Sequence, residues 1–115
     1  MAFTEFESKR YEAVARQFVE RRRPPVRIRQ QLDLRFRMSG QSVELFEVRP
    51  HWKNPDEILE NAVAKTTYVK TQEVWKLYWQ RADLRWHRYD PVPEAETLEE
   101  VLEAVEDDPY GCFFG

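Results

Sequence analysis

The chain has 115 residues, of which 42% are hydrophobic and 14% are aromatic, and its formal net charge is −3. This composition excludes a largely disordered chain, and the shortness of its apolar runs excludes a membrane-spanning helix. A single cysteine, Cys112, excludes an internal disulfide. We therefore expect one domain over residues 1–115 that works in the cytoplasm and away from membranes.

Charge is distributed unevenly along the chain. Residues 1–37 carry a net charge of +5, residues 38–89 carry +1, and residues 90–115 carry −9. A basic first part can form an anion-binding surface, or it can pair with the acidic last part inside the fold. The sequence leaves both interpretations open.

The first predicted element is a helix from Thr4 to about Arg22. Thr4 and Glu7 have the spacing of a capping box, and the apolar residues that follow recur at helical spacing. Three arginines at 21–23 then occupy the last turn, where cations suit the negative end of a helix, and two prolines follow. The arginines are explained by this helix end, with a phosphate-binding patch as the alternative.

Two strands are predicted next, over residues 31–38 and 42–49, with a turn at Ser39 and Gly40. The expected register places Arg35 opposite Glu44, which is a favourable cross-strand charge pair. The second strand breaks its alternation after Leu45. We interpret the break as a β-bulge in that strand, with burial on both faces as the alternative. A helical turn at 55–60 and a strand at about 63–70 are expected to follow.

The segment from Val74 to Tyr89 contains three of the four tryptophans and predicts a second hairpin. Apolar residues alternate with polar ones on both sides of a loop that we expect to contain two or four residues. This even number places Trp79 opposite Trp86, so that one face carries tryptophans and leucines and forms the core. The other face then carries Lys76, Tyr78, Gln80, Arg85, His87 and Tyr89.

The last predicted helix begins after Thr97, which has Glu100 at capping-box spacing. Its acidic end opposes the helix dipole and should fray unless arginines of the first helix lie near. The tail at 110–115 is too apolar to be free, so we expect it to dock. Together these elements predict an α+β fold with one mostly antiparallel sheet of about five strands, with both terminal helices on one face and the other face open.

The open face of this predicted sheet is the candidate binding surface. Its cations would neutralise phosphates and its rings would stack on bases, so single-stranded nucleic acid is the leading example of an anionic or aromatic ligand. The alternative is an ordinary solvated face on which tyrosines and arginines stack on each other. The candidate residues are Arg35, Arg37, Lys76, Tyr78, Arg85, His87 and Tyr89.

Two other classes of function compete with a binding domain. The first is a structural or protein-interaction module that forms a homodimer, since tyrosine, tryptophan and arginine are typical interface anchors. The second is a metal-dependent nuclease-like enzyme built on Glu47 and Lys65, although Arg49 stands where such a site has lysine and a second acidic ligand is missing. We expect no catalytic residue, metal site or cofactor, and we interpret Cys112 as a packed thiol.

Several motifs, in order along the chain, resemble those of one known family. The most specific is Trp-Lys-Leu-Tyr-Trp at 75–79, followed by Arg-Ala-Asp-Leu at 81–84. Others are Arg-Arg-Pro-Pro at 22–25, Phe-Glu-Val-Arg-Pro at 46–50 and the closing Phe-Phe-Gly at 113–115. This set resembles the bacterial "domain of unknown function 3024" family over nearly the whole chain. The resemblance implies a bacterial cytoplasmic domain and adds no activity, cofactor or catalytic residue.

Overall fold

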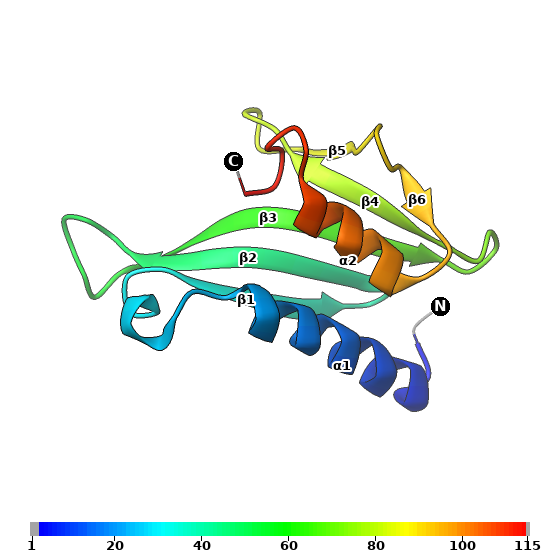
Figure 1. Ribbon diagram of the computed structural model, residues 1–115, viewed down its shortest axis with the longest axis horizontal. Helices are drawn as coiled ribbons and strands as arrows, with labels where there is room; N and C mark the ends of the chain where they lie inside the picture. Colours follow the sequence, from blue (N-terminus) through cyan, green and yellow to red (C-terminus); the bar gives the residue numbers. More distant parts are fainter. Residues whose placement is uncertain (1–2, 115) are drawn as a thin grey trace.

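The computed structural model describes residues 3–114 and contains two α-helices packed on an antiparallel sheet (Figure 1). The strand order is β1-β2-β3-β4-β5, and a short β6 also pairs with β4. The elements in chain order are α1 (Glu5–Arg22), the 3-10 helix η1 (Val26–Ile28), β1 (Asp33–Ser39), β2 (Ser42–Pro50), β3 (Ile58–Val69), β4 (Val74–Gln80), β5 (Trp86–Arg88), β6 (Glu94–Ala95) and α2 (Leu98–Asp107). The predicted α+β class is therefore confirmed.

Both helices begin at the threonines that the sequence indicates. The Glu7 N–H donates to Thr4 Oγ1 at 3.1 Å, and the Thr4 N–H donates to Glu7 Oε1 at 3.0 Å, which completes a capping box. At α2 the Glu100 N–H donates to Thr97 Oγ1 at 3.1 Å. These bonds satisfy amide groups that a helix start leaves unpaired. Within residues 3–114, no helix has the length and apolar character needed to cross a bilayer.

The main core lies between the helices and one face of the sheet, and both helices lie in front of the sheet in Figure 1. Trp75 on β4 is its largest fully buried side chain. The ring of Tyr11 on α1 lies 4.8 Å from that of Trp75, and the ring of Tyr68 on β3 lies 5.3 Å from it. Burial of each such side chain contributes roughly 1.5–3 kcal/mol. The core therefore fixes both helices on this side of the sheet.

The β1–β2 hairpin has the predicted faces but a different register. Ser39 pairs with Ser42, so the loop is Gly40 and Gln41, and Arg37 lies opposite Glu44 in place of Arg35. Gly40 has φ +58°, and a glycine at the first of two loop positions is typical of a type II′ turn. The predicted Arg35–Glu44 pair is wrong. Because the displacement is two residues, every side chain keeps its expected face.

The prediction of a β-bulge in β2 is wrong, because the bulge that the structure contains lies in β3. The register between β2 and β3 shifts between Leu45 and Phe46, where Val63 of β3 is the extra residue. The pairing of β2 with β1 continues without a break. Phe46 and Val48 are buried, although neither belongs to the main core cluster. The broken alternation thus reports burial on both faces of β2, which was the alternative interpretation.

The predicted helical turn at 55–60 is wrong, because β3 begins at Ile58. Pro50 pairs with Ile58, so the β2–β3 hairpin extends past the other strands, to the left in Figure 1. The Glu57 N–H donates to the Asn54 carbonyl at 2.9 Å and closes a turn in the loop. Cross-strand pairing with β2 makes this segment a strand, and a local sequence pattern does not reveal such pairing.

The β4–β5 hairpin differs from the prediction in a way that changes the site. The Leu84 N–H donates to the Arg81 carbonyl at 2.8 Å, and Leu84 has φ +63°. A turn followed by a left-handed residue makes a loop with an odd number of residues. Trp79 consequently pairs with His87, and the predicted pair of Trp79 with Trp86 is wrong. A slip of one residue moves every side chain of β5 to the other face.

The apolar tail docks on the domain, as predicted for the described residues up to 114; Gly115 lies outside them. Asp108 ends α2 with φ 34°, and its carboxylate accepts hydrogen bonds from the Phe113 N–H at 3.1 Å and the Phe114 N–H at 2.8 Å. Phe113 belongs to the core. The Arg22 guanidinium lies 4.1 Å from the centre of the Phe114 ring. An acidic helix end, unfavourable for the dipole, thus holds the tail in place.

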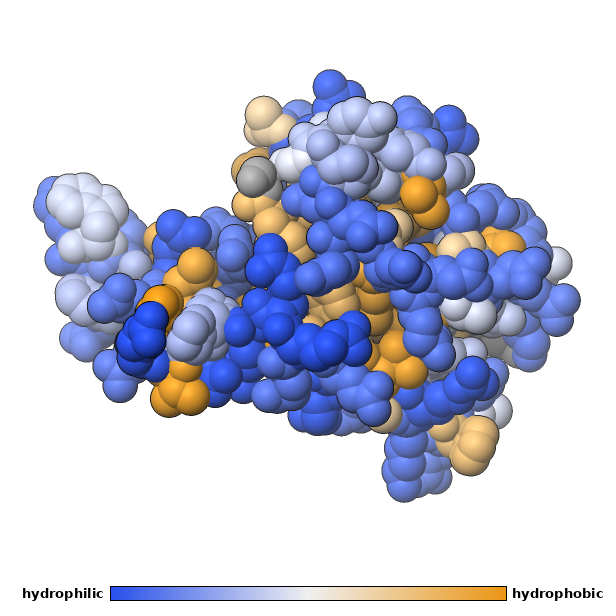
Figure 2. Space-filling view, viewed as in Figure 1, coloured by the Kyte–Doolittle hydropathy of each residue, from blue (hydrophilic) through white to orange (hydrophobic). Residues whose placement is uncertain are grey.

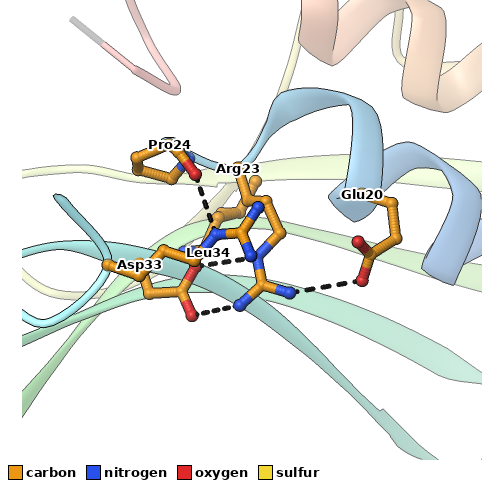
Figure 3. A network of polar contacts seen from close by, with 6 residues as sticks. Glu20, Arg23, Pro24, Asp33 and Leu34 are labelled. Atoms are coloured by element: carbon orange, nitrogen blue, oxygen red, sulfur yellow. Dashed lines mark hydrogen bonds and ion pairs between the residues drawn. The ribbon is translucent and has the colours of Figure 1, made fainter. Parts of the chain in front are cut away.

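Part of the basic first segment pairs inside the fold. Arg23 Nη2 lies 2.6 Å from Asp33 Oδ2, and Arg23 also approaches Glu20 (Figure 3). Arg22 Nε lies 3.5 Å from Glu106 Oε2 on α2. The pair of Arg22 with Glu106 supports the interpretation that the basic first part pairs with the acidic last part, whereas both partners of Arg23 lie in the first part itself.

Candidate binding face of the sheet

One face of the sheet points away from both helices, and we call it the open face. Cross-strand partners share a face, so the strand registers define its members. One row across the sheet runs from Arg37 through Glu44, Lys65 and Tyr78 to Arg88. The open face includes Arg35, Arg37, Ser39, Ser42, Glu44, Phe46, Val48, Glu60, Ala62, Lys65, Thr67, Lys76, Tyr78, Gln80, Trp86, Arg88 and Glu94.

Two aromatic rings lie close together on this face, beside a lysine. Lys65, Thr67, Tyr78 and Trp86 line a shallow hollow with a volume of about 160 Å³, which we call the aromatic hollow. Lys65 lies directly opposite Tyr78, and Trp86 projects from the neighbouring strand β5. All four side chains are half-buried, so the sheet supports them while leaving part of each accessible. A flat, unsaturated ligand can stack on such rings.

The charges of the open face fall into two groups. Arg37 is engaged by its own chain, because it pairs with Glu44 at 3.5 Å and with Glu60, and it lies 4.1 Å from the centre of the Phe46 ring. Lys65 and Lys76 form no ion pair within residues 3–114. Lys65 lines the aromatic hollow and Lys76 lies near it, so two lysines without an ion pair can attract an anionic ligand there, although Glu44 and Glu94 occupy the paired positions on the neighbouring strands.

Six of the seven predicted site residues are at least partly exposed, and four of these six lie on the open face. Arg35, Arg37, Lys76 and Tyr78 lie on the open face, on β1 and β4. Arg85 is exposed at the end of the β4–β5 loop, beside the strands and outside the rows of the face. Nothing in the fold brings the two arginines of β1 into the aromatic hollow, because β2 and β3 lie between them and β4.

His87 and Tyr89 are not on the open face, which corrects the prediction. His87 shares the helix side with Trp79, and its Nε2 lies 2.9 Å from Asp83 Oδ2. Tyr89 is only 1% exposed and packs against Phe113, with ring centres 4.7 Å apart. Burial raises the pKa of the Tyr89 hydroxyl above its ordinary value. The odd-numbered loop is the physical reason, since it reverses the faces of β5.

The same loop explains why the sequence did not reveal Trp86 as a site residue. A left-handed position after a turn is usually filled by glycine or asparagine, but here Leu84 fills it and is 75% exposed. Asp83 stabilises the loop by accepting the Arg85 N–H at 2.9 Å. This bond, together with His87, holds the pKa of Asp83 below its ordinary value. Asp83 was the only sequence signal for this loop, because aspartate commonly accepts a backbone N–H two residues later in a turn.

The nuclease-like arrangement does not occur. Glu47 pairs with Leu34 and so shares the helix side of the sheet, whereas Lys65 lies on the open face. In the part of the chain that the structure describes, no three His, Cys, Asp or Glu side chains are grouped so that they could hold a metal ion. Cys112 is a free, half-buried thiol, and burial raises its pKa. These residues offer neither a metal cluster nor an activated nucleophile.

A second hollow, of about 300 Å³, lies between α1 and α2. Figure 2 shows this side of the molecule, where hydrophobic residues are visible between the hydrophilic surfaces of the two helices. Its floor includes Phe18 and Leu102, which already belong to the packed core. Its rim carries Arg21 and three glutamates of α2. The hollow is larger than the aromatic one, but its apolar atoms serve the core and it offers no free ring.

The fold and the open face define a small α+β domain in which two helices cover one side of an antiparallel sheet and leave aromatic and basic side chains on the other. The family model described as Domain of unknown function (DUF3024) matches residues 3–115, so the chain belongs to this family. The resemblance of its motifs is thereby confirmed. No curated protein and no solved structure matches the chain.

Proposed function

We propose that this domain binds single-stranded nucleic acid on its open face. The observation that carries the proposal is the aromatic hollow, in which Tyr78 and Trp86 lie beside Lys65 on a face that no helix covers. Stacking of a base on an aromatic ring contributes roughly 1–3 kcal/mol and tolerates any base. Lysines next to the rings neutralise the phosphates that connect the bases.

The strands give this surface a suitable geometry. Tyr78 and Trp86 project from adjacent strands, so each ring can receive one base while the backbone of the ligand passes over the lysines. Lys76 lies on the same face as Tyr78, two residues away along β4. An unpaired strand is favoured over a duplex, because the bases of a duplex are already stacked on one another and cannot stack on protein rings.

The test is a titration of fluorescently labelled single-stranded DNA and RNA, followed by anisotropy at low and moderate salt. Trp86→Ala should weaken binding roughly 5- to 150-fold, which corresponds to the loss of about 1–3 kcal/mol of stacking. Lys76→Ala should weaken binding of all sequences alike and reduce the salt slope by about one. Lys9→Ala is the matched control, because Lys9 lies exposed on α1 and should not affect binding.

Two results would contradict the proposal. One is an absence of saturable binding at low salt, and the other is unchanged affinity in Trp86→Ala. Sedimentation of the unliganded protein distinguishes nucleic-acid binding from the competing function, a homodimeric protein-interaction module. If the protein is a dimer that Trp86→Ala converts to a monomer, the same rings form a homodimer interface, as aromatic anchors commonly do.

A further inference from the structure

The two edges of the sheet are constructed differently. At one edge lie the short strands β5 and β6, and Pro91 and Pro93 stand in the segment that joins them. Short strands and prolines are common devices that prevent an edge from pairing with another chain. At the other edge lies β1, which spans seven residues from Asp33 to Ser39 and contains no proline. β1 therefore keeps a continuous edge to which another strand could be added.

The register shows which backbone groups of β1 face outward. Ser39 and Ser42 flank the two-residue loop and form a hydrogen-bonded pair, so the residues at alternate positions bond to β2. Leu34, Phe36 and Met38 then direct their N–H and C=O groups away from the sheet. The Leu34 N–H is consistent with this arrangement, because it donates to Asp33 Oδ1 at 2.8 Å and not to β2. The backbone groups of Phe36 and Met38 have no partner within residues 3–114.

A hollow of about 230 Å³ lies beside this edge, between β1 and α1. Val19 of α1 with Leu34 and Phe36 of β1 contribute its apolar part. Arg16 and Glu20 of α1 and Arg23, which directly follows the helix, also line it. Phe36 is half-buried on the helix side of the sheet. A residue paired with Phe36 on an added strand would share that face, so its side chain would point toward this hollow.

Charge selects among the strands that could be added. Arg35 is exposed and forms no ion pair among the described residues, whereas Arg37 is already paired with Glu44 and Glu60. Antiparallel pairing of two copies about Phe36 would place Arg35 of each copy opposite Arg37 of the other, and like charges in that position are destabilising. A second copy of this chain is therefore disfavoured, and a strand with carboxylates at alternate positions is favoured.

We propose that the β1 edge binds an extended acidic segment of a partner protein as an additional strand. The backbone of that segment would bond to Phe36 and Met38, an apolar side chain would enter the hollow beside α1, and a carboxylate would lie next to Arg35. This is binding by strand addition, in which main-chain bonds supply affinity and alternate side chains supply specificity. It uses a part of the sheet that is separate from the aromatic hollow.

Hydrogen exchange tests the edge directly, with a peptide of alternating glutamate and leucine as the probe. Without peptide, the amides of Phe36 and Met38 should exchange quickly, while those of Arg35 and Arg37, which bond to β2, should be protected. Addition of the peptide should protect Phe36 and Met38. Protection of both amides before any peptide is added, or rapid exchange at saturating peptide, would overturn the proposal.

Fluorescence anisotropy of the labelled peptide compares its binding to matched variants of the protein. Arg35→Glu should weaken binding about tenfold or more. Met38→Pro removes an outward N–H that the β1–β2 ladder does not use, so it should abolish binding while the tryptophan emission of the fold is retained. Arg85→Glu, on an exposed loop, and Trp86→Ala, on the open face, should leave peptide binding unchanged. Equal binding of an alternating lysine and leucine peptide, or no loss in Arg35→Glu, would contradict the acidic partner.

Discussion

The two faces of the sheet are built from alternate residues of the same strands, yet they differ in what covers them. On the helix side, Trp75 and Leu77 are fully buried beneath α1 and α2. On the open face, Tyr78 and Trp86 remain partly accessible beside lysines. Burial explains the aromatic residues of the first face. It does not explain those of the second face, where polar β-branched residues would serve a solvated strand equally well. The open face is therefore the surface whose aromatic residues are left for a role other than core packing.

The largest difference in stability is expected between substitutions at two neighbouring residues of β4 that lie on opposite faces. Leu77→Ala should lower the free energy of unfolding by about 2–5 kcal/mol, because it leaves a cavity in a packed core. Tyr78→Ala, one residue further on the other face, should cost less than about 1 kcal/mol. Urea unfolding, monitored by tryptophan fluorescence, measures both values. If the two variants lose the same stability, the open face is as important to the fold as the core, and the contrast fails.

The difference between the two hairpins shows how far the sequence determines this comparison. In the β1–β2 hairpin, glycine marks the loop, and an error of two residues in the register left every face correct. In the β4–β5 hairpin, Leu84 adopts the left-handed conformation without a glycine signal, and an error of one residue reversed β5. Alternation in the sequence therefore predicted the core of β4 and the residues Lys76 and Tyr78. It could not predict Trp86, because loop parity depends on a backbone conformation that the residue type disfavours.

A second prediction concerns the contact that joins the helix layer to β1. Asp33→Asn should lower stability by about 2–3 kcal/mol at neutral pH, because Arg23 loses a charged hydrogen-bond partner. Burial opposes ionisation of Asp33, but hydrogen bonds from Arg23 and the Leu34 N–H outweigh it and hold the pKa below its ordinary value of 3.8. The folded-state pKa is thus the lower one.

The pH dependence of this pair has a defined sign. The stabilisation is complete above about pH 4, near the unfolded-state pKa, and is lost as the pH falls through the folded-state pKa. The difference in stability between the natural protein and Asp33→Asn should therefore shrink below about pH 4. Thermal unfolding from pH 7 to pH 2.5 measures it. A difference that grows toward acid would contradict the assigned ion pair.

A smaller effect is expected at the C-terminal segment that completes the helix side. Asp108→Ala removes the acceptor for the Phe113 and Phe114 amides and should cost about 1–3 kcal/mol. Asp108→Asn is the control, because asparagine tolerates the left-handed conformation and keeps one acceptor oxygen. Limited proteolysis should cut the tail of Asp108→Ala first. Equal resistance in both variants would show that Phe113 holds the tail without this carboxylate.

The smallest effect is expected at a tyrosine of the helix side. The hydroxyl of Tyr89 is buried and has no hydrogen-bond partner among the described residues. Tyr89→Phe should therefore leave stability unchanged or raise it by up to about 1 kcal/mol. Tyr78→Phe, the matched change on the open face, should also leave stability unchanged. Chemical denaturation measures the free energy of unfolding of both variants. A loss above about 1 kcal/mol in Tyr89→Phe would show that the Tyr89 hydroxyl is hydrogen-bonded in solution.

The most direct measurement is the map of backbone amide chemical shifts while a short single-stranded oligonucleotide is added. The account predicts that shifts concentrate around Lys65, Thr67, Lys76, Tyr78 and Trp86, on the open face of β3, β4 and β5. The chemical shifts of the amides in α1, α2 and the β1 edge should not change. Shifts confined to the helices, or no shifts at low salt with saturating oligonucleotide, would contradict the claim that the open face is the functional surface of this domain.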